Sequence, residues 1–295
     1  MSKRIVIVGA SSGIGLASAE AFARRGDRLL LVARDETALQ QAATSCRTEG
    51  ADDVVTLAAD VGKEADVQHV ADLAVQRFGG IDVLVHTATV MAYGTIEQLP
   101  REVFEEVVDV AIHGTAHLAR IVLPLLRQQG SGTVIIVNSL LGSVTVPNMG
   151  AYATAKWGQR AVARTLQQEV QHTRGVHVCI VSPGSTNTPI YYQAANYTGR
   201  SARPPVPVLQ PERTAAAIER LADRPRKHVS VPVGPTNPVI IIGYRLLPFV
   251  YDRLVGPLFR LMALTRTKES PNPGNVTTPH PEADRRFGHW PDRAA

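Results

Sequence analysis

The chain has 295 residues and a mass of 31.8 kDa, with 44% hydrophobic and 19% charged residues. This composition excludes a mainly disordered chain, a collagen-like repeat and a coiled coil, and the length suffices for one domain with a full core. Since Cys46 and Cys179 are the only cysteines, a disulfide scaffold is excluded. No cluster of Cys and His has the spacing of a zinc site, so we expect no metal.

The net charge of +5 and the isoelectric point near 9.4 raise the question of a nucleic-acid partner. A nucleic-acid interface would gather Lys and Arg on one face with aromatic residues between them. Here the basic residues are scattered and only 5% of residues are aromatic, so we expect no nucleic acid. Only four apolar residues precede Gly9, too few for a signal peptide, and no uncharged apolar run reaches about 18 residues without proline. We therefore expect no transmembrane helix and a cytoplasmic protein.

Short apolar runs alternate with longer amphipathic segments along the chain. The apolar runs, rich in Val, Ile and Leu, predict strands at 4–8, 28–33, 53–58, 81–86, 132–138, 176–182 and 228–233. The amphipathic segments predict helices near 13–25, 36–48, 64–78, 101–128, 150–173 and 211–223. Any charge in the strands lies at or next to the first residue, which is typical of strands buried on both faces. The alternation predicts a doubly wound α/β fold, a parallel sheet of about seven strands with helices on both faces and ligands at the carboxyl ends of the strands.

Two regions interrupt the alternation, and neither looks like an independent domain. Residues 189–210 carry several prolines and tyrosines, and we interpret them as a substrate lid on a catalytic domain spanning 1–235. Residues 236–264 are almost entirely apolar and predict a helical extension. Residues 265–295 are Pro-rich with few aliphatic side chains, so we expect them to be extended or disordered unless they dock on the domain.

The first predicted strand runs directly into a glycine-rich turn that opens a helix. Its GxxxGxG pattern comprises Gly9, Ser11, Ser12, Gly13, Ile14 and Gly15. Glycine lets the backbone turn sharply and approach a pyrophosphate, while the helix N-terminus offers free N–H groups and a positive dipole end. The alternative is a tight strand-to-helix turn without a ligand. The position directly after the first strand favours a dinucleotide phosphate site.

The end of the second strand carries Ala33 and Arg34, where an NAD site usually has an acidic residue for the ribose 2′-hydroxyl. Arg34 offers a forked, permanently charged group to a 2′-phosphate, so we favour NADP(H) and leave NAD(H) open. The alternative is a solvated arginine at a helix start, and Asp35 could pair with it. After the third strand, Asp60 and Val61 stand where an adenine amino group could bind, with a helix N-cap as the alternative.

A set of three polar side chains, at and beyond the end of the fifth predicted strand, suggests acid–base chemistry. Ser139 lies at the carboxyl end of that strand, where its hydroxyl could hold a carbonyl oxygen. Tyr152 and Lys156 are four residues apart in a predicted helix and therefore share a face. An ammonium near a phenol favours the phenolate and lowers its pKa, so the tyrosine can act as a general acid or base. Taken alone, a Tyr-x-x-x-Lys pair is more often ordinary helix surface.

In combination these residues resemble the short-chain dehydrogenase/reductase family over about residues 1–235. The matching positions are Gly9, Gly13, Gly15, Asp60, Ser139 thirteen before Tyr152, Lys156, and Ser182-Pro183-Gly184 followed by Thr188. The resemblance implies a Rossmann-type sheet and an NAD(P)-linked oxidoreductase acting on a carbonyl or an alcohol.

The resemblance also implies a role for each matching side chain. Tyr152 would exchange the proton with the substrate oxygen, Lys156 would tune Tyr152 and bind the nicotinamide ribose, and Ser139 would orient the substrate. Pro183 and Gly184 would shape the nicotinamide pocket.

One matching position remains, and the chain then departs from the family pattern at two places. Thr188 would reach the carboxamide or phosphate of the cofactor. The family usually has Asn-Asn-Ala-Gly after the fourth strand; this chain has His86-Thr87-Ala88-Thr89, and only Ala88 is retained for the adenosine side. The family's helix Asn, which binds a water that feeds protons to the lysine, is replaced by Ala111. His113 would point roughly 200° around the helix, so backbone carbonyls are the more suitable partners for that water.

The apolar extension at 236–264 must be covered by something, and Pro248 and Pro257 should kink or divide it. We expect it to pack near the lid or across a subunit contact and to help form an apolar substrate pocket. Contact with a membrane surface is the less favoured alternative. We also expect a homodimer or homotetramer.

These observations predict an NADP(H)-dependent oxidoreductase that transfers a hydride between nicotinamide and a carbonyl or secondary alcohol of an apolar substrate. The alternative is a catalytically weak NADP-binding sensor or scaffold of the same fold. The altered asparagine positions favour that alternative and the Ser-Tyr-Lys set opposes it, so turnover on ketones and alcohols distinguishes the two.

Overall fold

The computed structural model describes residues 2–225, 230–280, 282 and 284–290. In chain order the elements are β1 (Arg4–Val8), α1 (Gly13–Ala23), β2 (Arg28–Ala33), α2 (Glu36–Glu49), β3 (Asp53–Ala58), α3 (Glu64–Phe78), β4 (Val83–His86), β5 (Ala92–Tyr93), α4 (Arg101–Val108), a π segment (Asp109–His113), α5 (Gly114–Gln129), β6 (Gly132–Val137), a 3-10 turn (Leu140–Gly142), α6 (Gly150–Glu169), β7 (Val176–Pro183), α7 (Ile190–Gln193), β8 (Ala195–Asn196), β9 (Arg200–Ala202), α8 (Pro211–Asp223), β10 (Ser230–Val233), α9 (Asn237–Leu246), α10 (Pro248–Ala263) and β11 (Leu264–Lys268). Every strand and helix expected in the first 235 residues is present; the first two residues of the expected strand 228–233 lie outside the described residues.

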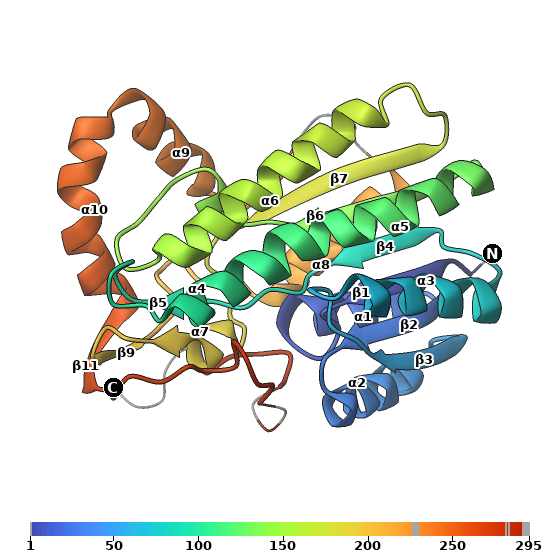
Figure 1. The fold of residues 1–295 in the computed structure, drawn as a ribbon, viewed down its shortest axis with the longest axis horizontal. Coiled ribbons are helices and arrows are strands. Elements are labelled where there is room, and N and C mark those ends of the chain that lie inside the picture. The colour runs from blue at the N-terminus through green and yellow to red at the C-terminus, as the bar shows by residue number, and fades with distance from the viewer. Residues whose placement is uncertain (1, 226–229, 281, 283, 291–295) are drawn as a thin grey trace.

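Seven strands form one parallel sheet in the order β10-β7-β6-β4-β1-β2-β3, which confirms the predicted doubly wound fold (Figure 1). The central strand β1 pairs with β2 on one side and β4 on the other, so Val6 lies beside both Leu30 and Leu84. The order reverses between β1 and β4, and at such a switch point the carboxyl ends of the strands open a crevice for ligands.

Helices cover both faces of the sheet because alternate strand residues point to opposite sides. Ile5 and Ile7 belong to the cluster that packs against α1, α2 and α8, whereas Val6 and Val8 belong to the cluster beneath α3, α5 and α6. Figure 1 shows these two helix layers on either side of the strands. The five inner strands are largely buried on both faces, as their uncharged interiors predict, whereas the edge strands β3 and β10 are only partly buried.

The helix predicted at 101–128 forms α4, the π segment and α5 without a break in the chain direction. Over Arg101–Gln129 it is long and apolar enough to cross a membrane, but half of its most apolar window is buried inside the domain. That burial is expected for a core helix, and by the same test no other described helix qualifies.

The apolar extension is divided at the predicted proline. Helix α9 ends at Leu246 and α10 begins at Pro248, where a proline needs no N–H partner, while Pro257 lies within α10. Both helices stand at one end of the molecule, away from the sheet layers (Figure 1). One side of α10 is buried through Phe259 and Ala263, and the other leaves large apolar side chains exposed.

The C-terminal tail is docked on the domain over the described part. Strand β11 pairs antiparallel with β9 of the predicted lid, and the chain then passes below α7 in the view of Figure 1. Val276 is fully buried in the core cluster beneath α3 and α5. The sequence predicts an extended or disordered tail unless it docks on the domain, and the described part of the tail does dock.

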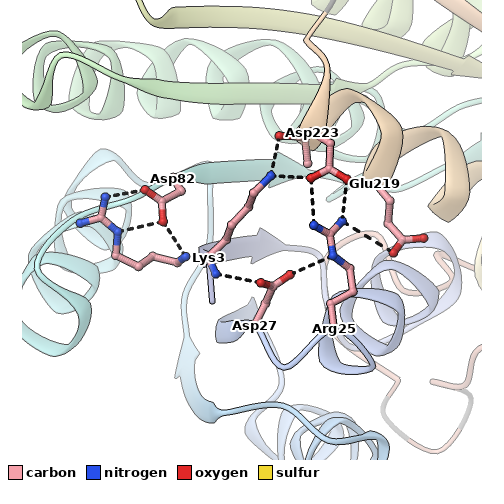
Figure 2. Close-up of polar contacts among 8 residues, drawn as sticks. Lys3, Arg25, Asp27, Asp82, Glu219 and Asp223 are labelled. Atoms are coloured by element: carbon pink, nitrogen blue, oxygen red, sulfur yellow. Dashed lines mark hydrogen bonds and ion pairs between the residues drawn. The ribbon is translucent and has the colours of Figure 1, made fainter. Parts of the chain in front are cut away.

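At the amino-terminal ends of the strands, a charged cluster ties the segment before β1 to α8 and to the turn after α1. Figure 2 shows Arg25 between Asp27, Glu219 and Asp223, with Lys3 reaching Asp223 from the other side. The closest ion pairs join Asp223 to Lys3 Nζ at 2.5 Å and to Arg25 Nη2 at 2.8 Å. Hydrogen bonds from Arg25 and Lys3 lower the pKa of Asp223 to about 2. The cluster is far from the carboxyl ends of the strands, and we interpret it as structural.

Candidate active site

A cavity of about 600 Å³ opens at the carboxyl ends of the strands. It extends from the glycine-rich turn after β1, past Ser139 and Tyr152, to the inner side of α10. This volume lies in the range of ligand sites in proteins. The residues predicted for the cofactor and for catalysis therefore line one continuous space.

The glycine-rich turn has the geometry of a phosphate cradle. Gly9 and Gly13 have φ values of +89° and +52°, which favour glycine. A Cβ on Gly15 would collide with the carbonyl oxygen of Gly9, so helix α1 starts directly against the end of β1. Ser11, Ser12 and Ile14 also line the cavity. The N–H groups at the start of α1 can thus be directed at an anion, and one of them, that of Gly13, donates here to the Arg285 carbonyl oxygen at 3.0 Å.

Arg34 lines the cavity at the end of β2, but its guanidinium is hydrogen-bonded to the C-terminal tail. Nη1 donates to the carbonyl oxygen of Val276 at 2.8 Å, and Nη2 donates to that of Asn275 at 2.6 Å. Asp35 does not pair with Arg34; it caps α2 by accepting from the backbone N–H of Ala38 at 2.8 Å. A 2′-phosphate would therefore have to share or replace the tail carbonyls at Arg34.

The adenosine side is lined by Asp60, Val61 and Ala88. Asp60 is not the N-cap of α3; its Oδ1 accepts from the Gly62 N–H at 2.9 Å in a local turn. The backbone N–H of Ala88 donates to the Val8 carbonyl oxygen at 3.0 Å. The segment therefore keeps its place at the end of β1 through its backbone, although its side chains differ from the family pattern.

Thr87 and Thr89 also line the cavity, although no role was expected for them from the sequence. The Thr87 hydroxyl lies within hydrogen-bonding distance of the carbonyl oxygens of Val8 and Gly9, at 2.8 and 3.1 Å. Thr89 lines the cavity and hydrogen-bonds with Tyr152. Both occupy positions where the family usually has Asn and Gly, and that departure was the available signal.

Ser139 and Tyr152 meet across the cavity. Ser139 follows β6, and its Oγ accepts from the backbone N–H of Leu141, which fixes the side chain in the 3-10 turn. Burial, followed by the neighbouring Tyr191, raises the pKa of Tyr152, while hydrogen bonds with Ser139 and Thr89 act in the opposite direction. The phenol is thus kept protonated and surrounded by hydroxyl groups.

Lys156 lies one turn after Tyr152, as the spacing predicts, but its ammonium points elsewhere. Nζ is 5.7 Å from the centre of the Tyr152 ring, and it donates to Gln159 Oε1 at 3.0 Å and to the Val137 carbonyl oxygen at 3.3 Å. Burial lowers the pKa of Lys156 to about 7. In this arrangement burial of the phenol dominates the pKa of Tyr152, and tuning of Tyr152 by Lys156 stays a prediction from the sequence.

The loop after β7 borders the same cavity. The Gly184 N–H donates to the Val233 carbonyl oxygen at 2.9 Å, and a Cβ on Gly184 would lie 2.7 Å from Asn237 Oδ1. Pro183 precedes it, and Thr188 lies close against Gly13 of the phosphate cradle. Asn237, at the start of α9, is buried and donates to the carbonyl oxygens of Ser182 and Val233, both at 3.2 Å, a link between the extension and this loop that no pattern in the sequence indicated.

The far end of the cavity is walled by apolar side chains from three parts of the chain. Met149 comes from the start of α6 and Tyr191 from the predicted lid, while Val250, Leu254 and Phe259 come from α10. Residues of the lid and of the extension thus face the same space as Tyr152.

Ala111, which replaces the family's helix asparagine, and the nearby His113 lie on different sides of their helix. Ala111 is fully buried in the π segment, and its carbonyl oxygen accepts from Thr115 Oγ1 at 2.6 Å. His113 is exposed and pairs with Asp109 at 2.7 Å. His113 therefore points away from the site, as its position on the helix predicts.

Comparison with known proteins identifies the family. Residues 3–196 match the family model described as short chain dehydrogenase, and the chain belongs to this family. It is 31% identical over 240 residues to 11-beta-hydroxysteroid dehydrogenase A of Sesamum indicum, covering 78% of this chain and 68% of that protein. This finding confirms the resemblance seen in the sequence, and the protein is an NAD(P)-linked oxidoreductase by family.

Solved structures agree with this placement. The alcohol dehydrogenase of the archaeon Thermococcus sibiricus, complexed with 5-hydroxy-NADP, superimposes with a TM-score of 0.66 at 29% identity, covering 77% of this chain and 93% of that one. A short chain dehydrogenase/reductase of Burkholderia phymatum, in complex with NAD, gives a TM-score of 0.73 at 25% identity and covers 86% and 95% of the two chains. Similar structures thus hold either nicotinamide cofactor.

Proposed function

We propose that the protein is an NADP(H)-dependent oxidoreductase that interconverts a ketone and a secondary alcohol of an apolar substrate, with Tyr152 as the general acid or base. The observation that carries this proposal is the single cavity, which joins the glycine-rich cradle to the Tyr152 phenol and to the apolar wall of α10. The sesame relative, named for a hydroxysteroid, supports an apolar alcohol or ketone.

The described residues fit a dinucleotide. The positive φ angles of Gly9 and Gly13 and the close approach at Gly15 leave room that any Cβ would fill. Arg34, with no acidic side chain in place of Ala33, supports NADP(H) over NAD(H). When bound, the nicotinamide supplies or accepts the hydride.

The protein groups handle the substrate oxygen and its proton. In the direction of reduction, Tyr152 gives its hydroxyl proton to the carbonyl oxygen as the carbon gains the hydride, and the product is the alcohol. The hydroxyl groups of Ser139 and Thr89 position the substrate oxygen next to the Tyr152 phenol. The raised pKa of Tyr152 keeps this proton available at neutral pH. In oxidation the same proton returns to the phenolate.

Turnover tests the proposal directly. We expect NADPH oxidation with bulky apolar ketones and much slower turnover of small polar ones, because the far wall offers few polar partners. Wild-type protein that binds NADPH but turns over no ketone or alcohol would instead favour the sensor or scaffold. The cytoplasmic location and the homodimeric or homotetrameric assembly stay predictions from the sequence.

A further inference from the structure

A buried chain of hydrogen bonds leads from Lys156 away from the cavity to the π segment. Lys156 Nζ donates to Gln159 Oε1 at 3.0 Å, and Gln159 Nε2 donates to Thr115 Oγ1 at 3.1 Å. Thr115 Oγ1 in turn donates to the Ala111 carbonyl oxygen at 2.6 Å. The side chains of Lys156, Gln159 and Thr115 are at most 2% exposed. These three side chains are therefore shielded from bulk solvent.

The chain has only one consistent orientation. The single hydroxyl proton of Thr115 is used at the Ala111 carbonyl, so Thr115 must accept from the amide nitrogen of Gln159. The oxygen of Gln159 then faces Lys156, and the Asn138 side chain also donates to it, at 3.1 Å. A reversed Gln159 amide would place N–H groups against two donors, a buried arrangement that proteins avoid.

We propose that Gln159, oriented by Thr115, is a positioning residue that holds the Lys156 ammonium and supports its charge. This role rests on the proposed function only in its effect on turnover, since the contact itself concerns Lys156 alone. It also explains how the chain tolerates alanine at position 111, because side chains bridge the distance from the lysine to that carbonyl.

The surroundings of Lys156 make this acceptor important. The titratable groups that face it are Tyr152 on its own helix and His86 on β4. Burial, followed by the charge of Lys156, lowers the pKa of His86 to about 3, so His86 is neutral at physiological pH. Among the described residues no carboxylate pairs with Lys156, which leaves Gln159 and the Val137 carbonyl as its hydrogen-bond acceptors.

The test is the titration of Lys156 observed by NMR. The chain has five lysines, so protein labelled with ¹³C at the lysine ε-carbon gives few signals, and Lys156 is assigned by its absence in Lys156→Met. Wild-type Lys156 is expected to titrate near 7. In Gln159→Met, which keeps the volume but removes the acceptor, the midpoint should fall by about one pH unit. The matched control is Gln167→Met, a buried glutamine of the same helix that donates to the Val178 carbonyl.

A second pair of variants keeps the proposal falsifiable if Gln159→Met does not fold. Thr115→Val removes the hydroxyl that orients Gln159 and should lower the midpoint, whereas Thr115→Ser should restore it. A midpoint that is unchanged in folded Gln159→Met, or that falls equally in Gln167→Met, overturns the proposal, as does equal behaviour of the two Thr115 variants.

The activity readout separates this inference from the proposed function. The limb of the pH profile that follows the charge of Lys156 lies near pH 7 in wild type, so in Gln159→Met this limb should move to lower pH together with the NMR midpoint. Wild-type protein without any turnover defeats the proposed function and leaves the NMR test of Gln159 decisive. Turnover with an unshifted pH profile in Gln159→Met defeats only the inference.

The C-terminal tail provides a second, independent observation. The N–H of Gly13, in the phosphate cradle, donates to the Arg285 carbonyl oxygen at 3.0 Å, just as the Arg34 guanidinium donates to Asn275 and Val276. Arg286 anchors this part of the tail through Glu20 of α1 at 2.5 Å and Glu212 of α8 at 3.3 Å. Tail carbonyls thus take donors at both phosphate positions of the proposed dinucleotide site.

We infer that the tail segment around Arg285 is an autoinhibitory strap that competes with the cofactor phosphates. This inference also rests on the proposed function, because the competing ligand is NADP(H). Arg286→Ala should loosen the strap and tighten NADPH binding several-fold, measured by cofactor fluorescence. The control is Arg285→Ala, because the side chain of Arg285 is exposed and only its backbone carbonyl contacts Gly13.

The outcomes are distinct. Weaker or unchanged NADPH binding in Arg286→Ala, or an equal change in Arg285→Ala, overturns the competition; weaker binding would mean that the tail covers the bound cofactor. If neither NADPH nor NADH binds to wild type or to Arg286→Ala, the proposed function fails together with the strap.

Discussion

Two phenylalanines of α10 allow a sharp test of whether the extension forms the substrate wall. Phe259 is 7% exposed, and its ring lies 6.3 Å from that of Tyr93. Phe249, on the same helix, is 79% exposed. Replacing a buried phenylalanine by alanine costs about 3–5 kcal/mol, whereas surface substitutions usually change stability by less than about 0.5 kcal/mol.

The other contacts of α10 set the scale of the effect. Tyr251 donates to the Thr145 carbonyl at 2.9 Å, and Arg203 donates to the carbonyls of Leu261 and Met262 at 3.0 and 3.1 Å. Three such hydrogen bonds contribute about 3 kcal/mol, comparable to the loss at Phe259. We therefore expect Phe259→Ala to release α10 locally, because its outer side has no further support.

Hydrogen exchange and steady-state kinetics measure this release. In Phe259→Ala the amides of α10 should exchange faster, and KM for an apolar ketone should rise about tenfold or more, since tenfold corresponds to about 1.4 kcal/mol. Phe249→Ala should match wild type in both measurements. Equal effects of the two substitutions, or an unchanged KM in Phe259→Ala with α10 exchanging faster, would refute the assignment of α10 to the substrate wall.

Three further changes test other parts of the molecule. Tyr152→Phe should lower kcat by roughly 10² or more while NADPH still binds, because a positioned proton donor contributes about that factor; a near-wild-type rate would exclude Tyr152 as the acid. Arg34→Ala should weaken NADPH far more than NADH, since only the former has a 2′-phosphate to lose, and equal losses would contradict the NADP assignment. Asp223→Asn should destabilise the fold by about 0.5–1 kcal/mol at pH 7, because this half-exposed carboxylate is screened by solvent. Its folded pKa of about 2 lies below the unfolded value, so the stability difference should persist above about pH 4 and vanish as the pH falls to 2; a difference independent of pH would contradict the ion-pair assignment.

The sequence by itself determined the fold and the family. Apolar runs of strand length with uncharged interiors, such as 4–8 and 132–138, are typical of strands buried on both faces in a parallel sheet covered by helices. The glycine-rich turn and the Tyr152–Lys156 spacing identified the cofactor and catalytic segments because both patterns depend on neighbours close in sequence. Pro248 divided the extension for an equally local reason.

Only the tertiary structure decided which partners the polar side chains take. Arg34 and Val276 are 242 positions apart, and no local pattern indicates that a tail carbonyl occupies the guanidinium. The helical spacing predicts Lys156 as the partner of Tyr152, yet the Lys156 ammonium donates a hydrogen bond to Gln159. Thr115, on another helix, sets the orientation of Gln159. A helix fixes which side chains share a face, whereas the hydrogen bond that a buried ammonium makes depends on the acceptors that packing brings within about 3 Å of it.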